Sequence, residues 1–238
     1  MNERSGLRER MKAACPELLL AAARAVRKAL FPARMRAKRF TGIYETNAWQ
    51  GDEAVSGSGS NLLQTQTLPA GLPTAPTRPD LRWLPAAPCG DVCWIAHTEL
   101  PVEDYIGADI VPDIIEMNRQ RFQNDGWSFV VADIIRDDLP RADAILCRDC
   151  LVHLSFREAL AAIRNMKRSG ARYLLTTHFT DRDSNTDIQT GDWRPLNLRL
   201  APFDFPEPCD LINERCTELD GKYSDKCLAM WRLADLAP

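Results

Sequence analysis

Three short apolar runs, each closed by a turn or an acid, constrain the fold of this chain most. The first run, residues 81–86, breaks at the turn Pro88-Cys89-Gly90, and the next two runs end in Asp109 and Asp133. The carboxyl ends of parallel strands lie along one sheet edge, so Gly90 and the two acids are expected to face a single crevice. A glycine there lets a ligand approach the backbone, and an acid about 20 residues further on suits a ribose diol.

The remaining segments alternate between helix and strand patterns. Pro112 opens a helix predicted over 112–123, and the capping box Ser155-Phe156-Arg157-Glu158 opens another that runs to about Arg168. A short helix is expected at 91–97, and strands at 104–108, 127–132, 142–147, 172–177, 211–216 and 226–233. This succession predicts an α/β fold, with right-handed crossovers and helices on both faces of the sheet.

Four motifs follow the predicted strands in order, namely Ala87-Pro88-Cys89-Gly90-Asp91, Gly107-Ala108-Asp109, Ala132-Asp133 and Leu146-Cys147-Arg148-Asp149. Their order and spacing resemble the cofactor motifs of class I S-adenosylmethionine-dependent methyltransferases, in particular bacterial members with a Pro-Cys-Gly-Asp first motif. The resemblance covers roughly residues 40–236. It implies a Rossmann-like, seven-stranded and mostly parallel sheet with an antiparallel last strand. It also implies a methyltransferase domain at 40–238, whose residues 40–80 form a cap and linker, behind a helical arm at 1–39.

The same resemblance assigns cofactor contacts. Gly90 would approach the cofactor, Asp109 would hold the ribose hydroxyls, and Asp133 with Ile134 would meet the adenine. A surface carboxylate at Asp109 and a helix cap at Asp133 are the alternatives. The family usually has an acid where this chain has Ala86, so cofactor affinity is in question. The expected contacts are Ser56, Gly57, Gly59, Ala87, Pro88, Cys89, Gly90, Asp91, Trp94, Asp109, Ile110, Asp133, Ile134 and Arg148.

Candidate catalytic residues follow the fourth and fifth predicted strands. His153, with Asp149 nearby, is the first candidate for a general base, because a histidine near neutrality can take a proton from a hydroxyl. His178 is the second candidate. The alternative for either histidine is a hydrogen-bonded structural role.

Two segments are expected to bind the methyl acceptor. The loop-like stretch 179–209 has the length of a functional lid, although its aromatic residues could instead pack it as a structural excursion. The segment from Phe40 to Thr67 is rich in Gly and Ser, which also allows a plain hinge. The expected contacts are Tyr44, Asn47, Trp49, Trp193, Arg194 and Asn197.

The charge distribution sets residues 1–39 apart. They hold eleven Lys or Arg against three Glu, whereas the whole chain carries a net charge of -3. A basic amphipathic helix can contact nucleic acid or an acidic membrane surface, or it can pack on the acidic body as a solvated helix.

The chain's eight cysteines accompany no secretory signal, and the apolar run near residue 20 is too short to span a membrane. Reduced thiols in a cytoplasmic protein are therefore expected. Cys89, Cys93, Cys147 and Cys150 allow a zinc site, but small apolar packing at strand ends is favoured, so no metal is predicted.

Together these features predict methyl transfer from S-adenosylmethionine to a hydroxyl of a small molecule or a saccharide. Such a reaction requires mainly that the acceptor be placed in line with the methyl group. The alternatives are a catalytically silent cofactor-binding protein, motivated by Ala86, and an RNA methyltransferase that uses the basic arm.

Overall fold

The computed structural model describes residues 33–52, 54–72, 85–98, 104–124 and 126–236. Most of the predicted basic arm lies outside the described residues, as do residues 81–84 of the predicted first strand. The end of the arm is described, and residues 33–45 are helical. We refer to this element as helix 33–45.

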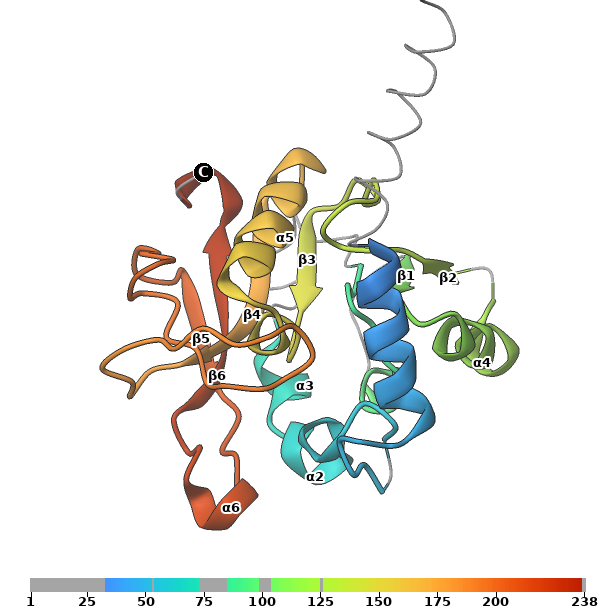
Figure 1. The fold of residues 1–238 in the computed structure, drawn as a ribbon, viewed down its shortest axis with the longest axis horizontal. Coiled ribbons are helices and arrows are strands. Elements are labelled where there is room, and N and C mark those ends of the chain that lie inside the picture. Colours follow the sequence, from blue (N-terminus) through green and yellow to red (C-terminus); the bar gives the residue numbers. More distant parts are fainter. Residues whose placement is uncertain (1–32, 53, 73–84, 99–103, 125, 237–238) are drawn as a thin grey trace, which may run out of the picture.

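The described strands form two groups, one of two strands and one of four (Figure 1). The named strands are β1 (Tyr105–Asp109), β2 (Trp127–Val131), β3 (Ala144–Cys147), β4 (Tyr173–Phe179), β5 (Asp210–Asn213) and β6 (Lys226–Arg232). β1 pairs with β2 in parallel, and β3 pairs with β4 in parallel. β6 runs antiparallel to both β4 and β5, so the last strand is antiparallel, as expected.

The segment around Ala86 joins the two groups of strands. Ala86 bridges in parallel to Gly107 of β1 and to Leu146 of β3. Its N–H donates to the carbonyl of Ile106, and the N–H of Ala87 donates to the carbonyl of Leu146. The described strand order is therefore β2-β1-(85–87)-β3-β4-β6-β5, in which residues 85–87 take the place of the predicted first strand without forming a named strand of their own.

Helices cover both faces of this sheet, as predicted. Ile145 and Leu174 point into a core with α5 (Phe156–Arg168), whereas Leu146 and Leu175 point into a second core with α3 (Leu68–Gly71) and α4 (Pro112–Phe122). The alternation follows from the period of two along a strand. The other short helical elements are η1 (Ser58–Ser60), α2 (Leu62–Thr65), η2 (Ile95–His97), η3 (Leu151–His153), α6 (Glu218–Gly221) and η4 (Leu233–Asp235).

Local sequence signals account for the longer helices. The hydroxyl of Ser155 accepts the N–H of Glu158 at the start of α5, as the capping box predicts. After α5, Gly170 adopts a positive φ of 80°, which ends the helix. Pro112 opens α4 at its first position.

Two predicted elements are shorter than expected. In place of a helix over 91–97 there is only the 3-10 turn η2, because Gly90 and Val92 adopt φ values of 55° and 48°. The strand predicted over 211–216 stops at Asn213, and Arg215 has a φ of 52°. Positive φ is incompatible with both regular structures, so the backbone turns at these points.

The long segment 179–209 has an interior of its own. Apart from the end of β4 at Phe179, it has no helix or named strand among its described residues, yet Leu196, Leu198, Phe203 and Phe205 are buried. Their contacts with the α5 core favour the structural excursion over a mobile lid.

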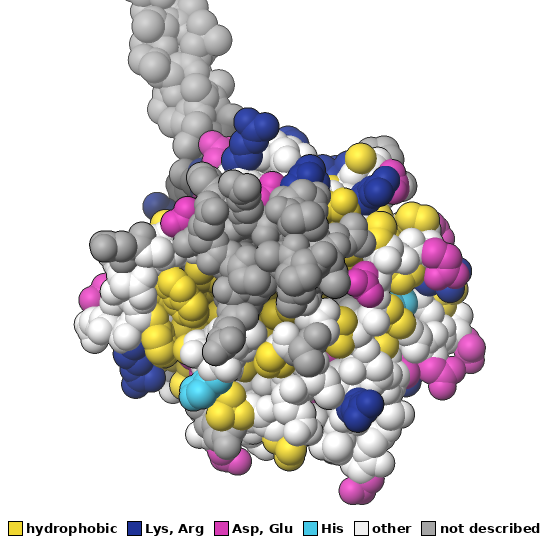
Figure 2. Space-filling model, turned by 180° about the vertical axis from the view of Figure 1, so that it is seen from behind, with side chains coloured by type: hydrophobic (Ala, Val, Ile, Leu, Met, Phe, Trp, Pro, Cys, Tyr) yellow, Lys and Arg dark blue, Asp and Glu magenta, His cyan; other side chains and the backbone are white. Residues whose placement is uncertain are grey.

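The outer surface of the protein carries both signs of charge. Seen from behind, Lys and Arg side chains are interspersed with Asp and Glu around the outline (Figure 2). None of the described helices has the length and apolar character that crossing a lipid bilayer requires.

Candidate active site

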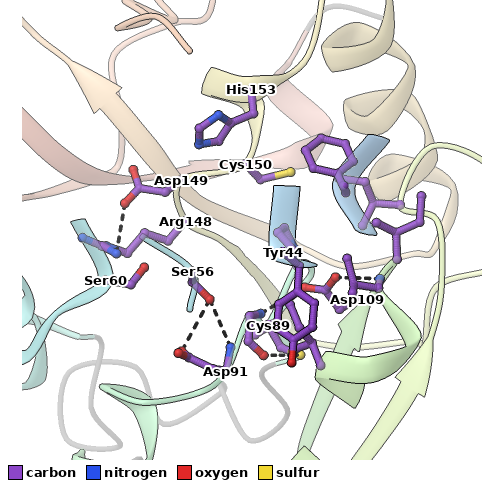
Figure 3. Close-up of a pocket in the computed structure, with 18 of the residues that line it drawn as sticks. Tyr44, Ser56, Ser60, Cys89, Asp91, Asp109, Arg148, Asp149, Cys150 and His153 are labelled. Atoms are coloured by element: carbon purple, nitrogen blue, oxygen red, sulfur yellow. Dashed lines mark hydrogen bonds and ion pairs between the residues drawn. The ribbon is translucent and has the colours of Figure 1, made fainter. Parts of the chain in front are cut away.

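A cavity lies at the carboxyl ends of the parallel strands, under helix 33–45 (Figure 3). Its empty space, together with the open solvent at its mouth, amounts to about 1120 Å³. It collects most of the predicted site residues: Tyr44, Trp49, Ser56, Pro88, Cys89, Gly90, Asp91, Trp94, Asp109, Ile110, Asp133, Ile134, Arg148, Asp149 and His153.

The glycine turn forms the floor of the cavity. Gly90 has a φ of 55°, and its N–H donates to Oδ2 of Asp109 over 3.1 Å. The amide of Asn118 donates to the Gly90 carbonyl over 2.7 Å, which fixes the turn from the side of α4. A Cβ at Gly90 would collide with Oγ of Ser56, so only glycine leaves this backbone open to a ligand.

Asp109 is a buried carboxylate at the end of β1. Besides Gly90, the N–H of Val111 donates to its Oδ1 over 3.0 Å. Burial raises the pKa of Asp109 to about 6, although these two N–H groups act in the opposite direction. The group is therefore ionised at neutral pH, and its remaining lone pairs can accept the two hydroxyls of a diol.

The segment 54–60 closes one side of the cavity by bonding to Asp91 (Figure 3). The N–H of Val55 donates to Oδ2 of Asp91 over 2.7 Å, and the N–H of Asp91 donates to Oγ of Ser56 over 3.1 Å. Gly57, Gly59 and Ala87, which were also expected to touch the cofactor, are not among the described residues that line the cavity. Ala87 belongs to the α5 core.

A group of charged side chains lies at the next wall, and we call it the buried charge cluster: the buried Arg148, Glu214 and Lys226 and the partly buried Asp149. Arg148 bonds Glu214 over 2.6 Å and Asp149 over 3.0 Å, and Lys226 lies 2.7 Å from Asp149. Arg148 also donates to the carbonyl of Gly59 over 2.7 Å, which ties the segment 54–60 to β3.

The cluster keeps Asp149 ionised. Burial alone would raise the pKa of Asp149, but the charges of Arg148 and Lys226 outweigh it and hold the pKa well below its usual range. The φ of Asp149 is 48°, and Thr177 Oγ1 accepts its N–H over 2.7 Å. A charged carboxylate is therefore fixed at the cavity wall.

His153 is neutral and held on two sides. Its Nδ1 lies 2.9 Å from the carbonyl oxygen of Asp192, which assigns the proton to Nδ1. Trp49 stacks on the ring with centroids 4.3 Å apart. Burial lowers the pKa of His153 to about 4. Within the described part of the chain no protein group bonds Nε2, so this nitrogen can accept a proton in the cavity.

Arg36, which lines the cavity from helix 33–45, was missed by the sequence reasoning. It donates to Asp133 over 2.5 Å and to Glu158 over 2.8 Å, and its side chain is buried. It was grouped with the solvated face of the basic arm, because neighbouring arginines on a helix carry no local signal of their distant partners. The pairing places helix 33–45 across the cavity.

Three residues expected in an acceptor lid lie elsewhere. Arg194 is buried and donates to the carbonyls of Leu151 and Leu154. Asn197 donates to the carbonyl of Arg182, and Trp193 packs against Phe179 and Tyr223. None of the three lines the cavity among the described residues, because the segment packs on its own interior instead of over the strand ends.

Two further candidates are also displaced from the cavity. His178 accepts the N–H of Leu198 at Nδ1 and stands edge-on to Trp231, so it occupies the core. Asn47 is exposed, and its side chain closes a local turn by bonding both the N–H and the carbonyl of Gly51. His178 therefore has a structural role, which was the alternative for either histidine. Asn47 likewise only shapes its own turn.

A sequence profile described as a methyltransferase domain matches residues 87–175. This stretch contains the glycine turn, both strand-end acids and His153. Residues 87–175 are thus similar to a methyltransferase domain. The match agrees with the predicted enzyme class over these residues. The narrower subgroup with a Pro-Cys-Gly-Asp motif stays a prediction.

Solved structures with a similar fold include human N-acetylserotonin methyltransferase in complex with S-adenosylmethionine. That comparison has a TM-score of 0.56 and 15% identity over 81% of this chain and 58% of that one, so the likeness is one of fold. An amino pentose methyltransferase from Micromonospora echinaspora matches with a TM-score of 0.41 and 21% identity, over 49% of this chain and 51% of that one.

A sugar N-methyltransferase from Streptoalloteichus matches with a TM-score of 0.40 and 21% identity, over 50% of this chain and 49% of that one. The chain thus spans roughly half of the length of these proteins. No curated protein sequence matches it significantly.

Proposed function

We propose that this chain transfers a methyl group from S-adenosylmethionine to a hydroxyl group of a small molecule or a saccharide. The observation that carries the proposal is the pair of a neutral His153 and an ionised Asp149 on one cavity wall. A hydroxyl keeps its proton at neutral pH, so its methylation gains from a base near the oxygen.

Two of the residues expected at the cofactor suit it, and two others suit it less well. The Gly90 backbone is open to close approach, and the Asp109 carboxylate suits a ribose diol. Asp133 fits less well, because Arg36 and the N–H of Ile135 already bond its two oxygens. Ala86, which lines the cavity, offers no charge to an amino group.

In the proposed reaction the side chains bind, orient and move one proton. Bound S-adenosylmethionine supplies a methyl group that is already activated as a sulfonium. Nε2 of His153 would take up the proton that the acceptor hydroxyl loses on methylation. The negative charge of Asp149 favours the imidazolium that forms, because it raises the proton affinity of His153. Holding the acceptor in line supplies much of the remaining rate.

Methyl-labelled S-adenosylmethionine tests this proposal against paired acceptors. Each pair consists of a hydroxyl compound and an amine counterpart that carries no hydroxyl, such as cyclohexanol with cyclohexylamine. We expect label in the hydroxyl compounds, and a kcat lower by roughly 10² to 10⁴ in His153→Gln with unchanged cofactor affinity.

His97→Gln is the matched control, because His97 is exposed and bonds only the carbonyl of Cys93. Its kcat should equal that of the wild type. Label confined to the amines, or full kcat in His153→Gln, contradicts the proposal.

A further inference from the structure

The stretch 186–194 lies against the turn η3, which carries His153. The N–H of Gly191 donates to the carbonyl of His153 over 2.8 Å, and the N–H of Arg194 donates to the carbonyl of Val152 over 3.1 Å. Between them, the Asp192 carbonyl lies 2.9 Å from Nδ1 of His153. The stretch therefore bonds both the backbone and the ring of this residue.

The guanidinium of Arg194 completes the arrangement. Nη1 donates to the carbonyl of Leu151 over 2.8 Å, and Nη2 donates to the carbonyl of Leu154 over 2.6 Å. These two carbonyls lie on either side of His153 in the sequence. Nε donates to the carbonyl of Thr186 over 3.2 Å, so one side chain joins both ends of the stretch to η3.

Burying the guanidinium of Arg194 costs more free energy than burying an apolar side chain. Its exposed fraction is 5%, and among the described residues all its hydrogen bonds go to main-chain carbonyls instead of a carboxylate. Burial lowers its pKa to about 10, so the group is still charged at neutral pH. Burying a cation whose hydrogen bonds go to carbonyls and not to a carboxylate is costly, and the charge of Asp187 and the Phe156 ring, 5.4 Å from the guanidinium carbon, offset part of this cost.

We propose that Arg194 is a positioning residue, which holds η3 so that His153 keeps its proton on Nδ1 and its Nε2 free for the acceptor. The assignment rests on the proposed role of His153 as a base. It differs from a general packing role, because it specifies the tautomer of one ring. Removing Arg194 releases the carbonyls of Leu151 and Leu154 and loosens the alignment of Nδ1 with Asp192.

Nitrogen NMR of the full chain with ¹⁵N-labelled histidine tests the assignment without any acceptor. The chain has three histidines, so His97→Gln and His178→Gln identify the signals of His153. We expect the wild-type ring to be protonated at Nδ1, and Arg194→Met to give a mixture of both tautomers. Arg194→Lys should fall between the two, because one ammonium cannot reach all three carbonyls.

Arg182→Met is the matched control. Arg182 belongs to the same segment, but it bonds Asp225 and does not contact η3. It should leave the His153 signals unchanged. If an acceptor is found, Arg194→Met should lower kcat about tenfold or more with unchanged cofactor affinity. The reason is that His153 with its proton on Nε2 cannot act as the base.

The outcomes separate the two proposals. A wild-type His153 protonated at Nε2 overturns the positioning role, even if Arg194→Met fails to fold. A folded Arg194→Met with the wild-type tautomer overturns it as well. If the tautomer depends on Arg194 but no acceptor of either kind is methylated, the positioning role stands and the proposed function fails.

Discussion

Backbone conformation at single residues decides how the cavity is lined. Gly90 and Asp149 both adopt positive φ, at 55° and 48°. Gly90 follows the bridged residues around Ala86, and Asp149 follows β3. Such conformations are strained for residues with a Cβ, and Thr177 and Lys226 fix Asp149 in place by bonding its N–H and its carboxylate. At Gly90 the conformation is free of strain, and Ser56 occupies the space that a side chain would need.

Gly90→Ala should therefore lose cofactor affinity as well as stability. The left-handed conformation costs an alanine about 1 to 2 kcal/mol, and the new methyl group would meet Oγ of Ser56. Gly170→Ala is the control, because Gly170 has a φ of 80° and no atom lies within 4 Å of the place that an alanine Cβ would take. We expect Gly90→Ala to lose at least as much stability in urea unfolding as Gly170→Ala, with affinity for S-adenosylhomocysteine reduced only at Gly90. Equal affinity in the two variants would show that the turn does not approach the cofactor.

Helix 33–45 closes the cavity through one buried ion-pair group. Arg36 bonds both Asp133, which follows β2, and Glu158, in the first turn of α5. Phe40 packs against the α5 core, and Tyr44 lines the cavity. The helix is therefore an integral wall of the site as well as the end of the predicted arm.

Arg36→Met should destabilise the protein far more than Arg39→Met. Removing one partner of a buried pair typically costs about 3 to 5 kcal/mol, since two carboxylates would be left without their cation. Arg39 pairs with Asp192 over 3.2 Å, but both side chains are 52% exposed, and such pairs contribute about 0 to 1 kcal/mol. Urea unfolding of both variants measures the difference. A similar free energy of unfolding for the two would mean that Arg36 does not hold helix 33–45.

Elements with strong local signals could be predicted from the sequence, and long-range partners could not. Ser155 and Pro112 located α5 and α4, because a cap and a first-turn proline act within one helical turn. The motifs also placed Gly90 and Asp109 in one cavity. The partners of Arg36 and Arg194 lie 122 and 43 residues away in sequence, and nothing local distinguishes these arginines from solvated ones. The segment 179–209 was interpreted as a lid because its loop composition does not reveal which face it packs on.

At the scale of the whole molecule, charged side chains from distant segments pair with one another beside the cavity. The buried charge cluster pairs two cations with two carboxylates, and segment 54–60 bonds to it through Gly59. Asp91 and Asp109 differ, because N–H groups rather than a cation bond their carboxylates, and burial raises the pKa of Asp109 to about 6. The assigned cofactor site therefore depends on whether the Asp109 carboxylate binds the ribose of the cofactor.

Calorimetric titration of the full chain with S-adenosylmethionine and S-adenosylhomocysteine, at pH 7.5 and pH 5, tests this claim most directly. Asp109 is ionised above its pKa of about 6 and takes up a proton as the pH falls through it, so affinity should fall by up to about tenfold between the two pH values. Asp109→Asn should bind weakly at both. If the folded wild-type protein binds neither compound at pH 7.5, or if Asp109→Asn binds as tightly as the wild type, the assigned cofactor site is wrong.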